Sequence, residues 1–261
     1  MTDTAHPSAP RPGVLITGAA RRLGAHLARG LAGDGWHVFV HYHSSAEDAA
    51  ALVRAIAQAG GSASALDADL TDPAAVDGLI GRARADGVQL RALVNNASSF
   101  LNDDLAGLDR ARWAVNHATN LEAPVFLARA FAAALPPTAE GVIINMLDNK
   151  VFALNPDFFS YTLAKVGLRG ATEMLAMALA PRIRVAGIAP GVTLISGKQT
   201  KESFERAQRM TPLGRGATPD QILAAARFIL ASPAFTGQVI TIDGGQVLEK
   251  LPRDVAYLTE S

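Results

Sequence analysis

A tyrosine and a lysine stand four residues apart in the segment "YTLAK", at Tyr161 and Lys165. In a helix this spacing puts both side chains on one face, within one turn. An ammonium beside a phenol favours the phenolate, so we expect Lys165 to lower the pKa of Tyr161 from its ordinary value of about 10. A tyrosine of this kind can pass a proton near neutral pH. The pair therefore predicts proton-transfer chemistry.

A loop with the sequence "TGAARRLG", residues 17–24, follows the apolar run "GVLI" and precedes a helical pattern. Gly18 permits a tight turn, and Gly24 permits close packing at the helix start. The free amides and the positive dipole end of a helix N-terminus bind phosphate. Arg21 and Arg22 stand in the middle of the loop, where such loops usually carry a glycine. The strand, loop and helix together predict a dinucleotide site.

The second strand-like run ends in "HVFVHYHSS" and carries no carboxylate. In dinucleotide-binding folds that prefer NAD, an Asp or Glu near this point binds the ribose hydroxyls. Here the residues are His41, Tyr42, His43 and Ser44, with an arginine of the first loop nearby. These groups suit a 2′-phosphate, so the pattern predicts NADPH as the cofactor. The alternative is an ordinary exposed, polar strand end.

Two further strand ends suit a cofactor. Asp69 ends the third run, in "DADL", where a carboxylate can hold the adenine amino group. The segment "VNNAS", residues 94–98, ends the fourth run, and its small side chains would let a cofactor pass close. The other expected cofactor contacts flank these motifs or the "APG" turn at 189–191: Leu23, Leu70, Asn96, Ala97, Ser98, Pro190 and Gly191.

Short apolar runs alternate with longer helical patterns along the chain, which predicts parallel strands joined by right-handed helical crossovers. Runs such as "VLIT" and "VIIN" are apolar on both faces, as a sheet covered on both sides requires. We therefore expect an α/β, single-domain Rossmann fold, with a doubly wound seven-stranded parallel sheet and helices on both faces. The expected strands are 13–17, 37–42, 62–70, 91–97, 141–146, 183–190 and 238–244. The expected helices are 22–33, 45–59, 72–86, 108–135, 158–180 and 219–231.

Composition limits the classes of function. The chain has 261 residues, 49% of them hydrophobic, which fits one domain over residues 13–245. A net charge of +0 provides no basic field for nucleic acid, and the lack of cysteine excludes thiolate catalysis and cysteine–metal sites. No segment approaches the ~20 apolar residues of a membrane helix. We expect a cytoplasmic protein with a small-molecule substrate, no metal and no membrane partner.

Three segments lie outside the regular pattern. Residues 1–12 are rich in Pro, Ser and Thr and predict a flexible tail. Residues 192–217 lack clear periodicity and follow a late strand, so we expect a substrate lid, with a surface excursion as the alternative. Residues 246–261 form a C-terminal extension that either reaches a neighbouring subunit or frays.

Over nearly its whole length the chain resembles the short-chain dehydrogenase/reductase family. The resemblance rests on "TGAARRLG", "NNAS", "YTLAK" and the "APG" turn, in that family's order and spacing. It implies that Tyr161 donates a proton and that Lys165 also holds the nicotinamide ribose. It further implies that Asn120 supports the lysine through water, with Asn116 as the rival assignment, and that the protein is a homotetramer.

One position departs from this family. The family usually has a serine thirteen residues before the tyrosine, where this chain has Asp148, in "NMLDNKV". A serine donates a hydrogen bond to a substrate carbonyl, whereas an ionised aspartate only accepts. Asp148 would repel the alkoxide that forms as a ketone is reduced, and it is better suited to relaying a proton while a C=N bond is reduced. Burial beside a nicotinamide would raise its pKa enough to carry that proton.

Pteridine reductases, a branch of the family, are similar at each unusual position: the loop, "HYH", "NNASSF" and the aspartate. By that resemblance, Arg22 reaches both the cofactor phosphates and a flat substrate, and Arg21 is a partner for the 2′-phosphate. Phe100 would stack on one face of the pterin, and Ser98 would bind its polar edge. The residue after "HYH" is often arginine in this branch and is Ser44 here, which removes one phosphate contact.

The leading hypothesis is an NADPH-dependent reductase of a dihydropterin or dihydrofolate, with Tyr161 and Asp148 delivering the proton. One alternative is a carbonyl reductase of the same family, acting for instance on 3-oxoacyl thioesters, against which Asp148 argues. A second alternative is a sensor that binds NADP without turnover, against which the intact pair of Tyr161 and Lys165 argues. The expected substrate contacts are Arg22, Ser98, Phe100, Asp148 and Tyr161.

Overall fold

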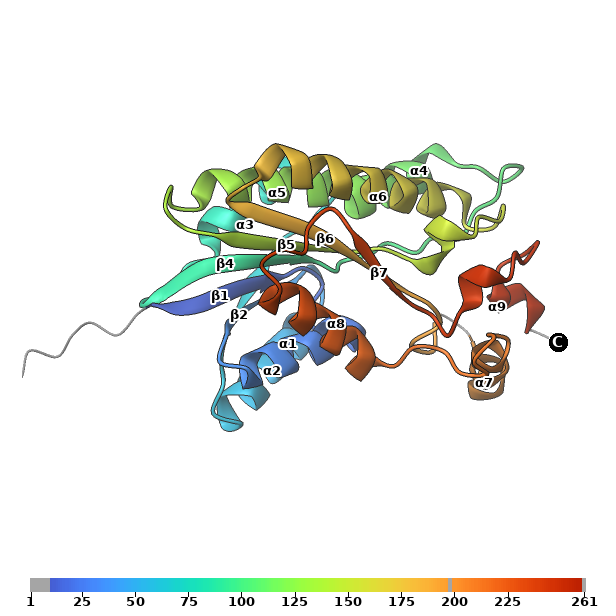
Figure 1. The fold of residues 1–261 in the computed structure, drawn as a ribbon, viewed down its shortest axis with the longest axis horizontal. Helices are drawn as coiled ribbons and strands as arrows, with labels where there is room; N and C mark the ends of the chain where they lie inside the picture. Colours follow the sequence, from blue (N-terminus) through green and yellow to red (C-terminus); the bar gives the residue numbers. More distant parts are fainter. Residues whose placement is uncertain (1–9, 197–198, 260–261) are drawn as a thin grey trace, which may run out of the picture.

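A single parallel sheet organises the chain, and the computed structural model describes residues 10–196 and 199–259 of it (Figure 1). The strand order is β3-β2-β1-β4-β5-β6-β7, and every neighbouring pair is parallel. The predicted seven-stranded, doubly wound sheet is therefore confirmed. The strands are β1 (Arg11–Ile16), β2 (His37–Tyr42), β3 (Ser62–Asp67), β4 (Val88–Asn95), β5 (Gly141–Met146), β6 (Ile183–Pro190) and β7 (Val239–Ile242).

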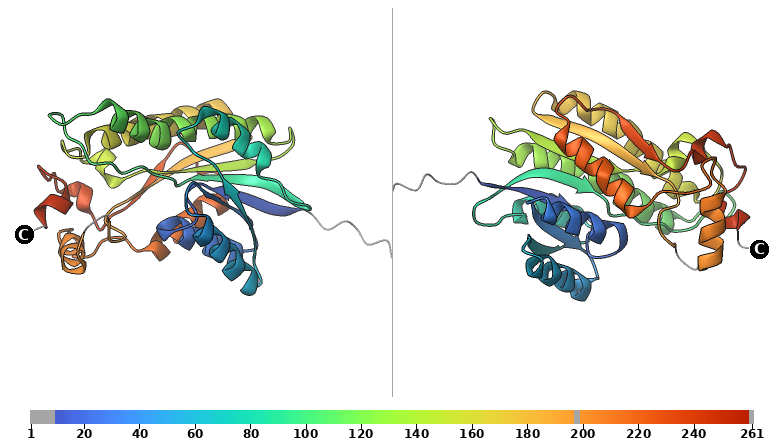
Figure 2. Two further views of the ribbon diagram at one scale, coloured as in Figure 1. Left: turned by 180° about the vertical axis from the view of Figure 1, so that it is seen from behind. Right: turned by 60° about the horizontal axis from the view of Figure 1, so that its bottom comes forward.

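Helices cover both faces of the sheet, as predicted (Figures 1 and 2). One face carries α1 (Arg22–Gly33), α2 (Ala46–Gln58) and α8 (Pro219–Ala231). The other face carries α3 (Pro73–Arg82), α4 (Arg110–His117), α5 (Ala123–Ala134) and α6 (Phe159–Leu179). Two short helices, α7 (Lys201–Arg209) and α9 (Val255–Leu258), lie beyond the end of the sheet in Figure 1.

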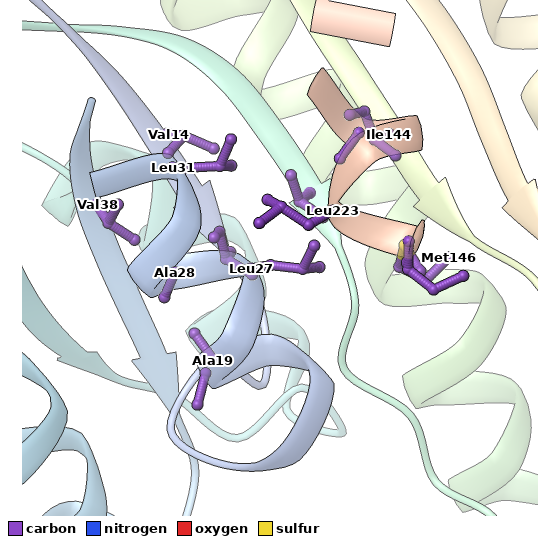
Figure 3. Packing of buried hydrophobic residues seen from close by; sticks show 14 of the residues in the cluster. Val14, Ala19, Leu27, Ala28, Leu31, Val38, Ile144, Met146 and Leu223 are labelled. Atoms are coloured by element: carbon purple, nitrogen blue, oxygen red, sulfur yellow. The ribbon is translucent and has the colours of Figure 1, made fainter. Parts of the chain in front are cut away.

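Alternate residues of the central strands feed two separate apolar layers, because successive side chains of a strand point to opposite faces. Val14 of β1 and Val38 of β2 pack against Leu27 and Leu31 of α1 in one layer (Figure 3). Leu15, the neighbour of Val14 in sequence, belongs to the layer on the opposite face. Both layers are needed to bury a parallel sheet, and they fix the strand ends from which the site is built.

The first strand begins earlier than expected. Arg11 and Pro12 belong to β1 and pair with Val88 and Gln89 of β4, so the expected tail of residues 1–12 is wrong at its last two positions. The strand pairing, and not local composition, orders these residues. The first nine residues of that expected tail lie outside the described residues.

The expected helix at 108–135 is interrupted. A π-helical turn, Ala118–Glu122, separates α4 from α5. Pro124 accounts for it, because a proline has no N–H for the carbonyl of Asn120 four residues before, and its ring crowds that carbonyl. The backbone widens at this point, which places Asn120 inside a distorted turn of the kind often found at functional sites.

The expected lid and the C-terminal extension are folded together. The expected lid at 192–217 contains α7, which Thr200 caps by accepting a hydrogen bond from the Ser203 amide. Ser203 in turn lies 2.9 Å from the Thr259 hydroxyl near the chain end. The C-terminal extension, as far as the structure describes it, therefore packs against α7 of its own chain, so its described part does not fray.

Candidate active site

Two adjoining cavities open where the strands end. The first, of about 720 Å³, surrounds the loop at 17–24, and the second, of about 610 Å³, lies between the end of β5 and the C-terminal extension. Parallel α/β sheets bind their ligands at this edge, where the strand order reverses. The residues that line both cavities are Arg22, Leu23, Ser98, Leu147, Tyr161 and Pro190.

The floor of the first cavity is the loop before α1. Gly18 has a φ of +61°, which glycine adopts without strain, and its amide donates to Nδ1 of His41 at 2.9 Å. A Cβ on Gly24 would lie 2.3 Å from the Gly18 carbonyl oxygen, so only glycine fits at this position. The Asn96 side chain donates to the carbonyls of Thr17 and Gly18. The loop is thus held close to the end of β4.

Arg22 adopts a left-handed backbone conformation with a φ of +53°. Its position is the one where such loops usually carry glycine, and the backbone keeps the geometry that glycine would adopt without strain. A non-glycine residue in this region costs on the order of 1–3 kcal/mol, and such strain tends to concentrate at functional sites. The Arg22 side chain lines both cavities, so it can contact the occupants of both.

His41 lines the first cavity, and both of its ring nitrogens are bonded within the chain. Its predicted contact with the 2′-phosphate stays a prediction. The ring is buried: Nδ1 accepts from the Gly18 amide, so Nε2 carries the proton and donates to the Ala68 carbonyl at 3.1 Å. Burial lowers the pKa of His41 from 6.5 to about 4, and the ring stays neutral. His41 therefore supports the loop by joining it to the end of β3.

The remaining residues expected at the 2′-phosphate differ in position. Arg21 and His43 both line the first cavity, but each has a carboxylate partner: Arg21 Nε lies 2.5 Å from Asp48, and His43 lies 3.7 Å from Asp69. Two others lie outside the cavity lining. Tyr42 packs against the core, and Ser44 is exposed.

Asp69 and its neighbours lie where the sequence predicted, at the end of β3. One Asp69 carboxylate oxygen accepts from both the amide and the hydroxyl of Thr71, and this bonding lowers the pKa of Asp69. Among the expected cofactor contacts after β3 and β4, the ones that line the first cavity are Asp69, Leu70, Asn96, Ala97 and Ser98. Gly191 lies in the lining of the second cavity only.

The residues predicted to transfer a proton meet between the two cavities. The Tyr161 hydroxyl donates to Oδ2 of Asp148 at 2.8 Å. Asp148 follows β5, and its other oxygen accepts from the Lys150 amide at 2.9 Å, which fixes the carboxyl group. The Lys165 ammonium lies 5.8 Å from the Tyr161 ring centre and donates to the Met146 carbonyl at 2.7 Å.

The pKa of Tyr161 moves opposite to the prediction. Burial and then the neighbouring Asp148 carboxylate raise it well above 10. Burial also raises the pKa of Asp148 and lowers the pKa of Lys165 to about 8. In this state desolvation outweighs the attraction of the ammonium, since charged forms are disfavoured in a buried site. Both groups of the Asp148–Tyr161 pair therefore hold their protons to a higher pH than the same side chains would in water.

A buried polar cluster anchors the start of α6, the helix that carries Tyr161. Asp103 accepts a hydrogen bond from the Ser160 amide at 3.0 Å and one from the Ser160 hydroxyl at 2.5 Å. Asn116 donates to the same hydroxyl at 2.8 Å. Asn116, the rival to Asn120, thus helps to hold Ser160, the residue next to Tyr161.

Asn120 lies behind Ser98 at the edge of the first cavity. Its side-chain oxygen accepts from the Ser98 hydroxyl at 2.8 Å, and its amide donates to the carbonyls of Ser99 and Asn116. No direct hydrogen bond to Lys165 is among the described contacts of Asn120. The expected link to the lysine through water stays a prediction.

Phe100 forms the aromatic wall of the second cavity. Its ring stacks on Phe158 at 4.2 Å and meets Tyr161 edge-on at 4.6 Å. The side chain is 44% exposed, so the ring leaves room for a flat group beside it. Phe158, like Arg22, has a positive φ, of +52°, which turns the chain into α6.

Comparison with known proteins decides the family. The model of a family described as Enoyl-(Acyl carrier protein) reductase, within the short-chain dehydrogenases, matches residues 18–246. The chain belongs to the short-chain dehydrogenase/reductase family. It is 33% identical to 3beta-hydroxysteroid dehydrogenase 1 of Eggerthella lenta, over 90% of this chain and 93% of that one. It is 32% identical to pteridine reductase 1 of Leishmania tarentolae, over 95% and 99% of the two chains.

Solved structures agree with these relatives. FolM alternative dihydrofolate reductase 1 from Brucella canis, complexed with NADP, superposes with a TM-score of 0.89 and 41% identity, covering 94% of this chain and 97% of that chain. A 3-oxoacyl-[acyl-carrier-protein] reductase of Synechocystis is also similar, at 31% identity over 90% and 96%. This short-chain reductase is therefore an oxidoreductase, and its pteridine reductase-like character is supported.

Sequence reasoning missed one wall of the second cavity of this short-chain reductase. The wall comes from the C-terminal extension and includes Leu251, Arg253 and Asp254, which line the cavity together with Lys150 and Asn155. The only signal in the sequence was a pair of opposite charges in "PRDV", which says nothing of a partner a hundred residues away. Among the described residues there is no cluster of metal-ligating side chains and no helix long and apolar enough to span a membrane.

Proposed function

We propose that this chain is an NADPH-dependent reductase of a C=N bond in a pterin or folate, of the kind that converts a dihydropterin to a tetrahydropterin. The observation that carries the proposal is the 2.8 Å hydrogen bond from Tyr161 to Asp148 at the second cavity. A carboxyl group with a raised pKa can hold a proton and deliver it to a ring nitrogen. A serine hydroxyl at the same position can donate a hydrogen bond, but it is too weak an acid to give its proton to the ring nitrogen.

The first cavity suits NADPH. The short loop between β1 and α1 brings backbone amides and a helix N-terminus to the cavity, and Arg21, Arg22 and His43 supply positive or protonatable groups for phosphates. Lys165, buried beside Tyr161, lines the same cavity and would hold the nicotinamide ribose. When bound, NADPH supplies the hydride. The NADP in the Brucella canis structure supports this choice of cofactor.

The second cavity suits a flat heterocycle. Phe100 presents a partly exposed ring, and Arg22 and Ser98 line the same space with polar groups. Aromatic rings stack face to face with offset, which favours a pterin over an aliphatic ketone. Asp148 and Tyr161 line the same cavity, so a proton could reach a ring bound there from them.

A carbonyl reductase is the rival function, because 3-oxoacyl reductases are among the relatives. Those reactions develop negative charge on an oxygen, which requires a hydrogen-bond donor beside the tyrosine. An ionised Asp148 would oppose that charge, and a protonated one would share its only proton with Tyr161 or with the substrate. The aspartate therefore favours the nitrogen substrate.

A substrate panel tests the proposal. The purified chain is mixed with NADPH and with dihydrobiopterin, dihydrofolate or an acetoacetyl thioester, and NADPH oxidation is followed by absorbance. Turnover with a pterin or folate, absent in Tyr161→Phe, is expected. Turnover with the thioester alone would replace the proposal by the carbonyl reductase, and NADPH binding without any turnover would favour a sensor.

A further inference from the structure

Two reciprocal ion pairs fasten the C-terminal extension to the active-site turn. Lys150 Nζ lies 3.0 Å from Asp254, and Arg253 Nε lies 2.8 Å from Asp157. The Asp254 amide also donates to Asp157 at 2.7 Å. Each of the two segments thus contributes one basic and one acidic residue, and each basic residue pairs with the acidic residue of the other segment. These pairs fix the position of the extension beside the second cavity.

Lys150 connects this fastening to Asp148. Its amide donates to the Asp148 carboxyl at 2.9 Å, while its ammonium reaches Asp254 and, at 2.6 Å, the Asp157 carbonyl. The residue is only 7% exposed. A buried ammonium without its counter-ion is strongly unfavourable, so loss of Asp254 would drive Lys150 out of its place. The short 3₁₀ turn, Asn149–Phe152, would move with it.

Asp254 also acts on the proton-transfer pair by charge. It contributes to the raised pKa of both Asp148 and Tyr161, although burial is the largest cause for each. Lys165 acts on Asp148 in the opposite direction. The ionisable groups around the Asp148 carboxyl come from α6, from the turn after β5, from α1 and from the extension: Tyr161, Lys165, Lys150, Arg22 and Asp254.

We propose that Asp254 is a positioning residue for the reaction: it holds Lys150, and through Lys150 the turn that presents the Asp148 carboxyl to the Tyr161 hydroxyl. The inference rests on the proposed function for its kinetic readout. It assigns the C-terminal extension a role in the chemistry as well as in shaping the cavity. Asp254 itself need not touch the substrate.

The test compares Asp254→Asn, which removes the charge at nearly constant shape, with the conservative Asp254→Glu. Asp34→Asn is the matched control, because Asp34 pairs with Arg227 and lines neither cavity. We expect Asp254→Asn to lower kcat by about ten- to a hundredfold, since small misplacements of reacting groups have effects of this size. The Kd for NADPH, measured by fluorescence, should be unchanged, and Asp254→Glu should recover most of the activity.

The pH profile separates positioning from simple destabilisation. Without the Asp254 charge the pKa of Asp148 falls, so the decline of kcat with rising pH should begin at a lower pH than in the wild type. An unchanged kcat and pH profile would overturn the proposal. A loss of NADPH binding as large as the loss of kcat would also overturn it, because that result indicates general damage to both cavities and not the displacement of one turn.

A crystal structure of Asp254→Asn provides a readout that needs no substrate. We expect the turn after Asp148 to shift and the 2.8 Å contact between Tyr161 and Asp148 to break. If the wild-type chain reduces no pterin or folate, the proposed function fails, and this structure still decides the positioning role. An intact contact in the variant would overturn it.

Discussion

The hydroxyl of Tyr161 donates a 2.8 Å hydrogen bond to the carboxyl group of Asp148. Burial is the main cause of the raised pKa of both groups, and their mutual interaction raises that of Tyr161 further. The two side chains come from different elements, one from the first turn of α6 and one from the end of β5, so the fold itself creates the pair. The raised pKa values favour the protonated forms, and a protonated pair can supply the proton that reduction of a C=N bond needs.

The pH dependence of turnover follows from this pair. Because the pKa of Asp148 is raised, the carboxyl keeps its proton above the usual range and loses it as the pH rises further. We expect kcat to be highest on the acid side and to fall as the pH rises through the pKa of Asp148. In Asp148→Asn this decline should disappear together with most of the activity. Steady-state kinetics at several pH values, with saturating NADPH, measure this dependence. A kcat that rises with pH in this range would contradict the prediction.

The variant Arg22→Gly should separate the backbone strain at this position from the contribution of the Arg22 side chain to ligand binding. The left-handed φ of Arg22 costs free energy that glycine does not, while glycine loses more entropy on folding, so the variant should be as stable as the wild type or more stable by up to about 1 kcal/mol. The KM for the pterin should rise more than the Kd for NADPH. Urea unfolding and ligand titration measure both. A larger loss of NADPH affinity would make Arg22 a phosphate ligand only.

The buried, neutral His41 should make the folded chain less stable in acid. Its pKa is about 4 in the folded chain and 6.5 when unfolded, so the unfolded state binds more protons between these values and stability falls as the pH drops from 6.5 to 4. The difference corresponds to about 3 kcal/mol of the free energy of unfolding. Denaturant unfolding at several pH values measures it. In His41→Asn the slope over this range should be shallower; an equal slope would assign the effect to other groups.

Gly24→Ala should damage the cofactor site. The new Cβ would lie 2.3 Å from the Gly18 carbonyl oxygen and 2.7 Å from the Asn96 amide, both of which hold the loop. Overpacking of this kind costs typically 1–3 kcal/mol. We expect weaker NADPH binding and a lower urea midpoint. Gly33→Ala is the control, because nothing lies within 4 Å of its Cβ position; equal effects in both variants would contradict the argument.

The sheet and its main helices could be predicted because they depend on local patterns. Apolar runs and helix caps gave the bounds of α1 and α8 at 22–33 and 219–231 as the structure has them. The missed helix, α7, has the polar sequence "KESFERAQR", and it buries only Ser203 and Ala207. Its apolar face is too small to be recognised from sequence, and it packs against a segment some fifty residues later.

The residues of the candidate site could be predicted from the sequence, whereas the pKa shifts of their side chains could not. The spacing of Tyr161 and Lys165 correctly indicates one helix face, but it contains no information on burial, which reverses the expected pKa shift of the tyrosine. The position of His41 at a strand end likewise contains no information on the burial of its ring, which lowers its pKa. The ion pair between Lys150 and Asp254 joins positions 104 residues apart, and only the folded chain brings them together.

The role of Asp148 is tested most directly by the ratio of kcat/KM for a dihydropterin to that for an acetoacetyl thioester, measured in the wild type and in Asp148→Ser. The account predicts that the wild type prefers the pterin and that the serine variant loses pterin reduction by about a hundredfold or more, the usual contribution of a positioned acid. Thioester reduction should be unchanged or increased in that variant. An unchanged pterin rate in Asp148→Ser would contradict the account.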